Sequence, residues 1–271
     1  SFRLPIPVIV CERSYPGNAQ VPMFMSLIRY LLYPRAHAIV CQTKAAKIWL
    51  ERRFPVSKIS IISNPISFPL PLGNSAFLKP EDFISSDRLI LLSVGRLGPE
   101  KGYDLLIEAF SSVASEFKEW DLVIVGEGEN RKALDQVIQN HGLTNRVFLP
   151  GEAGNPGDWY DRADLFAMTS WYEGFPNALL EAMSYGTASI SFDCLAGPAD
   201  MIEHKTNGYL VPPQQGSLGF GKALQELMSD AEMRNEFGKE AKSSIQSNFS
   251  LEKVNADWMQ TIQETLPHGS N

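Results

Sequence analysis

Short apolar runs alternate along this chain with segments whose apolar residues recur at helical spacing. The runs predict buried strands, and the spaced segments predict helices that bury one face. From residue 88 onward the alternation is regular, as in the strand expected at 89–94 and the helix expected at 102–117. This order predicts βαβ units and an α/β fold with a parallel, doubly wound sheet.

The later units repeat the pattern. Further strands are expected at 122–125, 146–149, 165–169 and 188–192. Further helices are expected at 130–141, 158–162, 177–185, 198–203, 217–229, 231–246 and 251–265. Ligands of such sheets bind outside the carboxyl ends of the strands, so the loops that follow the strands are the place to look for a site.

The front of the chain is shorter and less regular. It predicts strands at 8–11, 38–41 and 59–62, with an apolar helix at 22–32 and a second helix at 43–53. Residues 63–87 contain four prolines, which fix φ and donate no hydrogen bond, so this segment is predicted to be an interdomain linker. The expected division is a partial domain at 1–62, the linker at 63–87, a Rossmann-like domain at 88–249, and a C-terminal helix with a tail at 250–271.

Composition places the chain among ordinary soluble globular proteins. It has 271 residues, of which 44% are hydrophobic and 20% charged, enough apolar material for a real core. The three cysteines (Cys11, Cys41, Cys194) are far apart, which argues against a disulfide framework or a CxxC-type zinc site and favours a reducing, cytoplasmic setting. The longest apolar run, 23–33, is shorter than the roughly 20 residues of a membrane span.

Charge is distributed unevenly. Residues 1–60 carry nine Lys or Arg against two acidic residues, a net +7, whereas residues 61–271 carry a net −14. The basic front favours an anionic partner such as lipid head groups on a membrane, and the acidic body disfavours nucleic acid. A solvated helix face explains the same charges equally well.

Two cations flank the turn after the strand 89–94. The turn reads VGRLGPEKG (94–102), so Arg96 and Lys101 stand five residues apart at the end of a strand. From there they could hold a diphosphate from two directions. The alternative is an ordinary turn whose basic residues face solvent.

A second candidate segment reads EGFPNALLE (173–181). Its proline suits the first turn of a helix, whose free amides would point toward a nearby phosphate. Glu173 precedes that helix, and Glu181 lies about one turn inside it, where a carboxylate could accept hydrogen bonds from a ribose diol. Alternatively, Glu173 only complements the helix dipole and Glu181 is a surface charge.

Other sequence motifs are excluded. The segment GEG (126–128) follows a predicted strand, but Arg131 occupies the third glycine position of a dinucleotide fingerprint, so a nicotinamide enzyme is disfavoured. The chain has no HExxH, GxSxG, Walker or Asp-x-Asp sequence, and its four histidines are isolated. We therefore expect no metal and no cofactor, with Arg, Lys and helix dipoles neutralising any phosphate.

Together these motifs resemble the donor-binding half of the retaining glycosyltransferases of family 4. The resemblance rests on GR at 95–96, KG at 101–102 and the segment 173–181, and DCLAGP (193–198) and NGYLVP (207–212) extend it. It runs from about residue 63 to residue 249. In the front piece, CERSYP (11–16) and RAHAIV (35–40) are similar to the end of the family's acceptor domain, with His37 in place of an aspartate.

The resemblance implies a GT-B fold, in which two Rossmann-like domains face each other across a cleft. It implies that Arg96 and Lys101 hold the donor diphosphate, that Glu173 contacts the transferred sugar and that Glu181 binds the ribose. The donor would be a nucleotide sugar, with UDP the expected nucleotide. The backbone of the following residues is expected to contact this donor: Gly95, Gly126, Gly174, Phe175, Asn177 and Ala178.

The acceptor would be a glycan or a polyprenyl-linked sugar, which places the protein in the cytoplasm and against the inner face of the cytoplasmic membrane. A full acceptor domain has several more βα units than residues 1–62 supply. The first hypothesis is therefore an active glycosyltransferase that is truncated here, and the second a donor-binding module that does not catalyse. A third is a membrane-surface adaptor using the helix near 22–35, which could instead pack under the acceptor domain.

Overall fold

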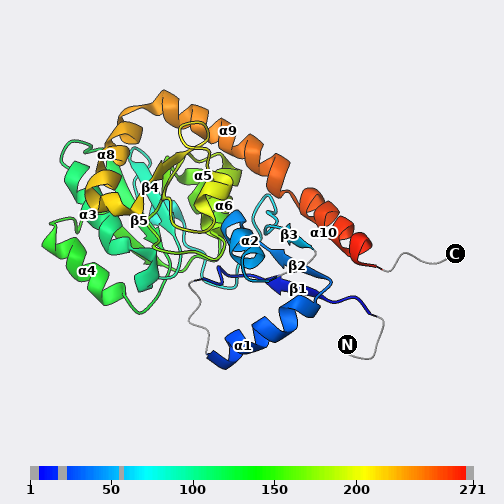
Figure 1. The fold of residues 1–271 in the computed structure, drawn as a ribbon. Coiled ribbons are helices and arrows are strands. Elements are labelled where there is room, and N and C mark those ends of the chain that lie inside the picture. The colour runs from blue at the N-terminus through cyan, green and yellow to red at the C-terminus, as the bar shows by residue number, and fades with distance from the viewer. Residues whose placement is uncertain (1–5, 18–22, 55–57, 267–271) are drawn as a thin grey trace.

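The computed structural model describes residues 6–17, 23–54 and 58–266. It contains two parallel sheets, each with its own helices (Figure 1). The smaller sheet consists of β1 (Ile9–Glu12), β2 (Ala38–Cys41) and β3 (Ile59–Ile61), in that order. Its connections contain α1 (Met23–Leu32) and α2 (Lys44–Glu51).

The larger sheet has six strands in the order β6-β5-β4-β7-β8-β9. These strands are β4 (Leu89–Val94), β5 (Trp120–Val125), β6 (Val147–Gly151), β7 (Leu165–Met168), β8 (Ser189–Phe192) and β9 (Tyr209–Val211). The order reverses between β4 and β7, which are direct neighbours. A crevice at such a reversal, outside the carboxyl ends of the strands, is where doubly wound sheets bind ligands.

Helices cover both faces of the larger sheet, because side chains alternate from one face of a strand to the other. Its helices are α3 (Tyr103–Val113), α4 (Arg131–Asn140), α5 (Pro156–Arg162), α6 (Asn177–Tyr185), α7 (Pro198–Met201), α8 (Gly216–Ser229) and α9 (Ala231–Phe249). Leu91 and Ile124 pack with α3, α4 and α8 on one face. Ile90 and Val123 pack with α5, α6 and most of α9 on the other. The predicted Rossmann-like α/β fold with parallel sheets is thus confirmed.

Several predicted boundaries need correction: α2 ends at Glu51, β6 runs to Gly151, α7 ends at Met201 and α9 runs to Phe249. Helix α3 ends at Val113 rather than at residue 117. In the turn that follows, the Arg146 guanidinium donates to the carbonyls of Ala114 and Phe117 at 3.2 and 2.9 Å. The strand expected at 122–125 begins at Trp120, which pairs with Leu89. The sequence analysis missed β9, a three-residue strand at the edge of the sheet, directly before Pro212.

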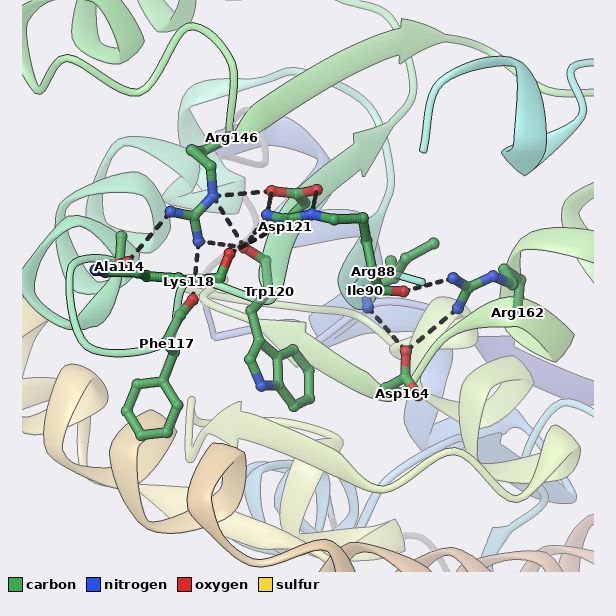
Figure 2. Close-up of polar contacts among 10 residues, drawn as sticks. All are labelled: Arg88, Ile90, Ala114, Phe117, Lys118, Trp120, Asp121, Arg146, Arg162 and Asp164. Carbon is green, nitrogen blue, oxygen red and sulfur yellow. Dashed lines mark hydrogen bonds and ion pairs between the residues drawn. The ribbon is translucent and has the colours of Figure 1, made fainter. Parts of the chain in front are cut away.

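A polar network closes the amino ends of the central strands (Figure 2). Asp121, only 3% exposed, accepts hydrogen bonds from Arg88 Nε at 2.7 Å and from Arg146 Nε at 2.9 Å. Asp164 accepts from the Ile90 backbone amide at 2.8 Å. The network therefore lies at the end of the sheet opposite to the crevice and has a structural role.

The segment 63–87 packs along the larger unit over much of its length. The Ile66 amide donates to the Phe249 carbonyl at 2.9 Å, and the Gly73 amide donates to the Gly154 carbonyl at 2.7 Å. Ile84 is buried in the core. Helix α10 (Leu251–Thr265) extends toward the smaller sheet (Figure 1), where Val254 packs against Val40. The domain boundaries drawn from the sequence stay predictions.

Candidate active site

Two adjoining cavities open at the carboxyl ends of the strands, the first at β4 and β7 and the second at β4, β5 and β6. The first has a volume of about 340 Å³ and the second about 450 Å³. Both are lined by Val94 and Gly95, which end β4. The site therefore occupies the crevice that the strand order defines.

Lys101 and Glu173 form an ion pair in the first cavity. Lys101 Nζ lies 2.7 Å from Glu173 Oε1, and the two side chains are 22% and 11% exposed. Ser170, which also lines the cavity, donates its hydroxyl to the same carboxylate oxygen at 2.7 Å. The cavity thus contains one cation whose charge is already partly balanced.

The backbone before α3 brings Lys101 into place. Pro99–Lys101 forms a turn of 3₁₀ helix, and Gly102 follows in the left-handed region with φ +61°. A Cβ at Gly102 would lie 2.5 Å from the Thr169 carbonyl oxygen, so only glycine fits this approach between the β4 and β7 loops. Thr169 also donates its hydroxyl to the Gly102 carbonyl at 2.9 Å.

The amino end of α6 faces the same cavity. Phe175, Asn177 and Ala178 line it. The Asn177 amide donates to the Phe175 carbonyl at 3.0 Å. The Ala178 amide lies in the first turn of α6, where the helix itself provides no hydrogen-bond acceptor. With the positive end of the helix dipole, this turn favours an anion.

Glu181 lines the deep side of the first cavity rather than the protein surface. Tyr160, which is 1% exposed, donates its hydroxyl to Glu181 Oε2 at 2.8 Å. Burial raises the pKa of the Glu181 carboxyl, and the Tyr160 hydrogen bond opposes part of that rise. The alternative that Glu181 is a surface charge is therefore wrong.

Arg96 lies apart from Lys101. It lines the second cavity with Gly126, and its side chain is 60% exposed. Its guanidinium is paired with Glu100 at 2.6 Å and with Glu129 at 3.3 Å. The two cations therefore border adjoining cavities and do not face each other within one.

Two glycines of the site serve close packing. A Cβ on Gly126, which has φ +148°, would lie 2.0 Å from the Gly95 carbonyl oxygen, so neither loop could keep its path with a larger residue. Gly174 is not among the residues lining either cavity. A Cβ there would lie 3.2 Å from the carbonyl oxygen of Arg13, in the smaller unit.

The sequence analysis missed Asn64, at the start of the segment 63–87, which reaches the rim through Asn177, and Arg13 of the smaller unit, which contacts Asn64. Asn64 donates its amide to Asn177 at 2.8 Å and accepts from Arg13 at 3.0 Å. It also missed Ser170 and Tyr160, although Ser170 opens a loop that it identified by its place after a strand. No local signal marks Tyr160, because its contact with Glu181 spans 21 residues of sequence.

Within residues 6–17, 23–54 and 58–266, no three His, Cys, Asp or Glu side chains are placed to hold a metal ion together. Over the same residues, no helix has the length and apolar content that crossing a membrane requires.

A doubly wound sheet with an anion-favouring crevice at its reversal is the arrangement in which many α/β proteins bind nucleotides. The family model described as "Glycosyl transferases group 1" matches residues 75–244. The chain therefore belongs to this family of glycosyltransferases.

Curated relatives agree with the family. The chain is 28% identical over 243 residues to the amylovoran biosynthesis glycosyltransferase AmsD of Erwinia amylovora, covering 89% of this chain and 66% of the relative. It is 31% identical over 229 residues to a Campylobacter jejuni 4-alpha-N-acetylgalactosaminyltransferase whose name gives a diphospho-undecaprenol-linked sugar as acceptor, covering 84% and 60%. The chain thus spans about two thirds or less of the length of these relatives.

Solved structures share the fold. Anabaena Alr3699/HepE in complex with UDP superposes with a TM-score of 0.83 at 20% identity, covering 95% of this chain and 72% of that one. A Staphylococcus aureus TarM mutant, also a complex with UDP, gives 0.79 at 22% identity, covering 94% and 50%. At these identities the likeness supports the GT-B type of fold.

Proposed function

We propose that the chain is the donor-binding part of a retaining glycosyltransferase of family 4, which transfers a hexose from a UDP-linked donor. The observation that carries this proposal is the convergence of Lys101, Glu173, Glu181 and the first turn of α6 on one cavity. One cation, one helix dipole and two carboxylates match the needs of a diphosphate flanked by two sugars. Two structures of similar fold were solved as complexes with UDP, which supports the choice of nucleotide.

In the proposed arrangement, the diphosphate lies between Lys101 and the amino end of α6. Glu181 accepts hydrogen bonds from the ribose, and Glu173 from hydroxyls of the transferred sugar. The base occupies the second cavity, where the exposed Arg96 side chain can turn from Glu100 and Glu129 toward the phosphates. In this arrangement each of the described groups contacts one part of the donor.

The reaction is a displacement at the anomeric carbon of the donor. The acceptor hydroxyl oxygen forms the new bond to that carbon while the bond to the β-phosphate oxygen breaks. The departing diphosphate keeps the electron pair. Because the acceptor approaches on the same face of the sugar that the diphosphate leaves, the diphosphate also receives the proton of the hydroxyl. Lys101, Arg96 and the α6 dipole stabilise the developing negative charge, an effect of several kcal/mol when donors are fixed in advance.

The acceptor that we propose is a glycan or a polyprenyl-linked sugar. Support comes from the relatives, of which one acts in amylovoran biosynthesis and another, by its name, on an undecaprenol-linked sugar. Such acceptors place the enzyme in the cytoplasm, at the inner face of the cytoplasmic membrane.

Calorimetric titration of the chain with UDP, GDP, ADP and inorganic pyrophosphate tests the donor site. We expect UDP to bind most tightly. Glu181→Ala should weaken UDP about tenfold or more, as loss of a charged hydrogen-bond acceptor does, and leave pyrophosphate unchanged. Equal losses on both ligands would contradict the ribose assignment, and no binding of any ligand would contradict the donor site itself.

A nucleotide-sugar-binding module without transfer is the second candidate. Donor hydrolysis and transfer assays on the 271-residue chain separate the candidates, because the module binds UDP but releases no sugar. For an active enzyme, the NMR coupling constant of the new anomeric proton shows whether configuration is retained.

A further inference from the structure

Tyr160, on α5, is a buried phenol that lies behind the first cavity. Its side chain is 1% exposed, and it is not among the residues that line the two donor cavities. Its hydroxyl donates to Glu181 Oε2 at 2.8 Å, and Glu181 does line the first cavity. Tyr160 therefore acts on the site through this carboxylate and does not itself touch a ligand.

Packing fixes the direction in which the Tyr160 hydroxyl points. The ring centroid of Tyr160 lies 6.1 Å from that of Phe166 in β7 and 5.9 Å from that of Tyr185 at the end of α6. Thr187 donates its hydroxyl to the Tyr160 backbone carbonyl at 3.1 Å. A side chain locked by its neighbours in this way presents its hydrogen-bond donor before any ligand arrives.

The Tyr160 hydrogen bond also favours the charged form of Glu181. Burial raises the pKa of the Glu181 carboxyl, and the hydrogen bond from Tyr160 lowers it again in part. Of the described residues, no cation contributes to the pKa of this carboxyl. Tyr160 thus supports both the orientation and the ionisation of Glu181.

The same contact divides the two oxygens of the carboxylate. Tyr160 occupies one acceptor position of Oε2, which leaves Oε1 for a ligand in the cavity. The 2′ and 3′ hydroxyls of a ribose are two neighbouring donors, and a carboxylate oxygen can accept two hydrogen bonds. A 2′-deoxyribose would leave one acceptor position of this partly buried group unpaired, and a site built for a hydroxyl rejects the analogue that lacks it.

We propose that Tyr160 is a positioning residue that holds Glu181 toward the ribose diol, so that the site selects ribonucleoside over 2′-deoxyribonucleoside diphosphate sugars. The inference rests on the proposed function, because it takes Glu181 as the acceptor of the ribose hydroxyls. It adds the class of nucleotide that the site rejects and the residue, outside the cavity, on which the rejection depends.

Calorimetric titration of the 271-residue chain with UDP, 2′-deoxy-UDP and inorganic pyrophosphate tests this role. We expect the wild type to bind UDP about tenfold or more tightly than 2′-deoxy-UDP. Tyr160→Phe keeps the packed ring and removes the hydroxyl, so UDP affinity should fall about five- to tenfold and the preference over 2′-deoxy-UDP to about twofold or less. Pyrophosphate affinity should stay unchanged, whereas a merely structural role of Tyr160 would weaken all three ligands alike.

Tyr185→Phe is the matched control. Tyr185 packs against the ring of Tyr160, but its hydroxyl accepts a hydrogen bond from the Leu70 amide at 3.3 Å. Its removal should leave the preference for UDP as in the wild type. In a double-mutant cycle, Tyr160→Phe added to Glu181→Ala should change nothing further, because Tyr160 acts through Glu181. Additive losses in this cycle would overturn the proposal.

A second variant tests the positioning with Tyr160 in place. Glu181→Asp keeps the charge but draws the carboxylate back by one methylene, so the preference for UDP should fall to about twofold or less, as in Tyr160→Phe. A wild-type preference in Glu181→Asp would show that the position of the carboxylate does not matter and would overturn the proposal.

The outcomes separate this inference from the proposed function. A wild-type preference for UDP in Tyr160→Phe, together with its loss in Glu181→Ala, would overturn the role of Tyr160 and leave the ribose assignment intact. A wild type that binds UDP and 2′-deoxy-UDP equally would overturn the ribose assignment and the inference with it. Circular dichroism and pyrophosphate titration show whether each variant is folded.

Discussion

Lys101 Nζ lies 2.7 Å from Glu173 Oε1, at the mouth of the cavity between β4 and β7. The cation proposed to neutralise the donor diphosphate is therefore held by the carboxylate proposed to bind the transferred sugar. A phosphate that approaches Lys101 has to share the ammonium with Glu173. Because of this competition, mutation of Lys101 and mutation of Glu173 should change UDP binding in opposite directions.

Glu173→Gln should strengthen UDP binding and weaken sugar transfer. The amide removes a negative charge next to Lys101, which should raise UDP affinity about two- to fivefold, the size of a partly exposed ion pair. Loss of a charged acceptor for sugar hydroxyls should lower transfer about 10- to 100-fold. Calorimetry and a transfer assay measure the two effects, and a parallel fall in both would contradict the proposed division of roles.

Lys101→Ala should weaken UDP about 10- to 100-fold, because a charge-assisted hydrogen bond to phosphate is lost. Arg96→Ala should cost less, since Arg96 is exposed and has to leave Glu100 and Glu129 before it can bind. Lys132→Ala, at an exposed position on α4, is the matched control and should leave affinity unchanged. A larger loss of UDP affinity in Arg96→Ala than in Lys101→Ala would contradict this prediction.

The partly buried carboxyl of Glu181 should make thermal unfolding depend on pH. Its pKa is raised by burial above the ordinary value near 4.5, so the folded state holds the proton more tightly than the unfolded state. Stability from this group is complete below pH 4.5 and is lost as pH rises through the raised pKa. The melting temperature of the wild type should thus fall relative to that of Glu181→Gln between pH 4.5 and 8. If the melting temperatures of both proteins depend on pH in the same way, the raised pKa of Glu181 is contradicted.

Asp121→Asn should destabilise the fold without touching the donor site. The change leaves the guanidiniums of Arg88 and Arg146 without their shared carboxylate, which should cost about 3 kcal/mol and lower the melting temperature by about 6–10 °C. UDP affinity should stay as in the wild type, because the network lies at the opposite end of the strands. Asp257→Asn, in an ion pair within α10, is the control and should cost about 0.5 kcal/mol or less.

The larger sheet was largely predictable from the sequence, since its strands are buried on both faces and read as plain apolar runs. For the same reason, Lys101, Glu173 and Glu181 could be expected near one crevice: each follows a strand of a parallel sheet. β9, a three-residue strand at the edge of the sheet, was not predicted.

Pairings between distant loops were not predictable. Arg96 meets Glu129 across 33 residues of sequence, and Glu181 meets Tyr160 across 21. These contacts depend on how strands are ordered and how far each loop extends, which no local pattern records. They decide which cation faces the cavity and which carboxyl is buried, so the roles of single residues needed the structure.

The packing of Val254 against Val40 and Ile62 has a consequence for synthesis. The ribosome synthesises the strands of the smaller sheet about two hundred residues before α10, the helix that packs against them. Until α10 emerges, that apolar face is open to water and to chaperones. Docking of α10 onto the smaller sheet therefore has to wait until the whole of the larger unit has been synthesised.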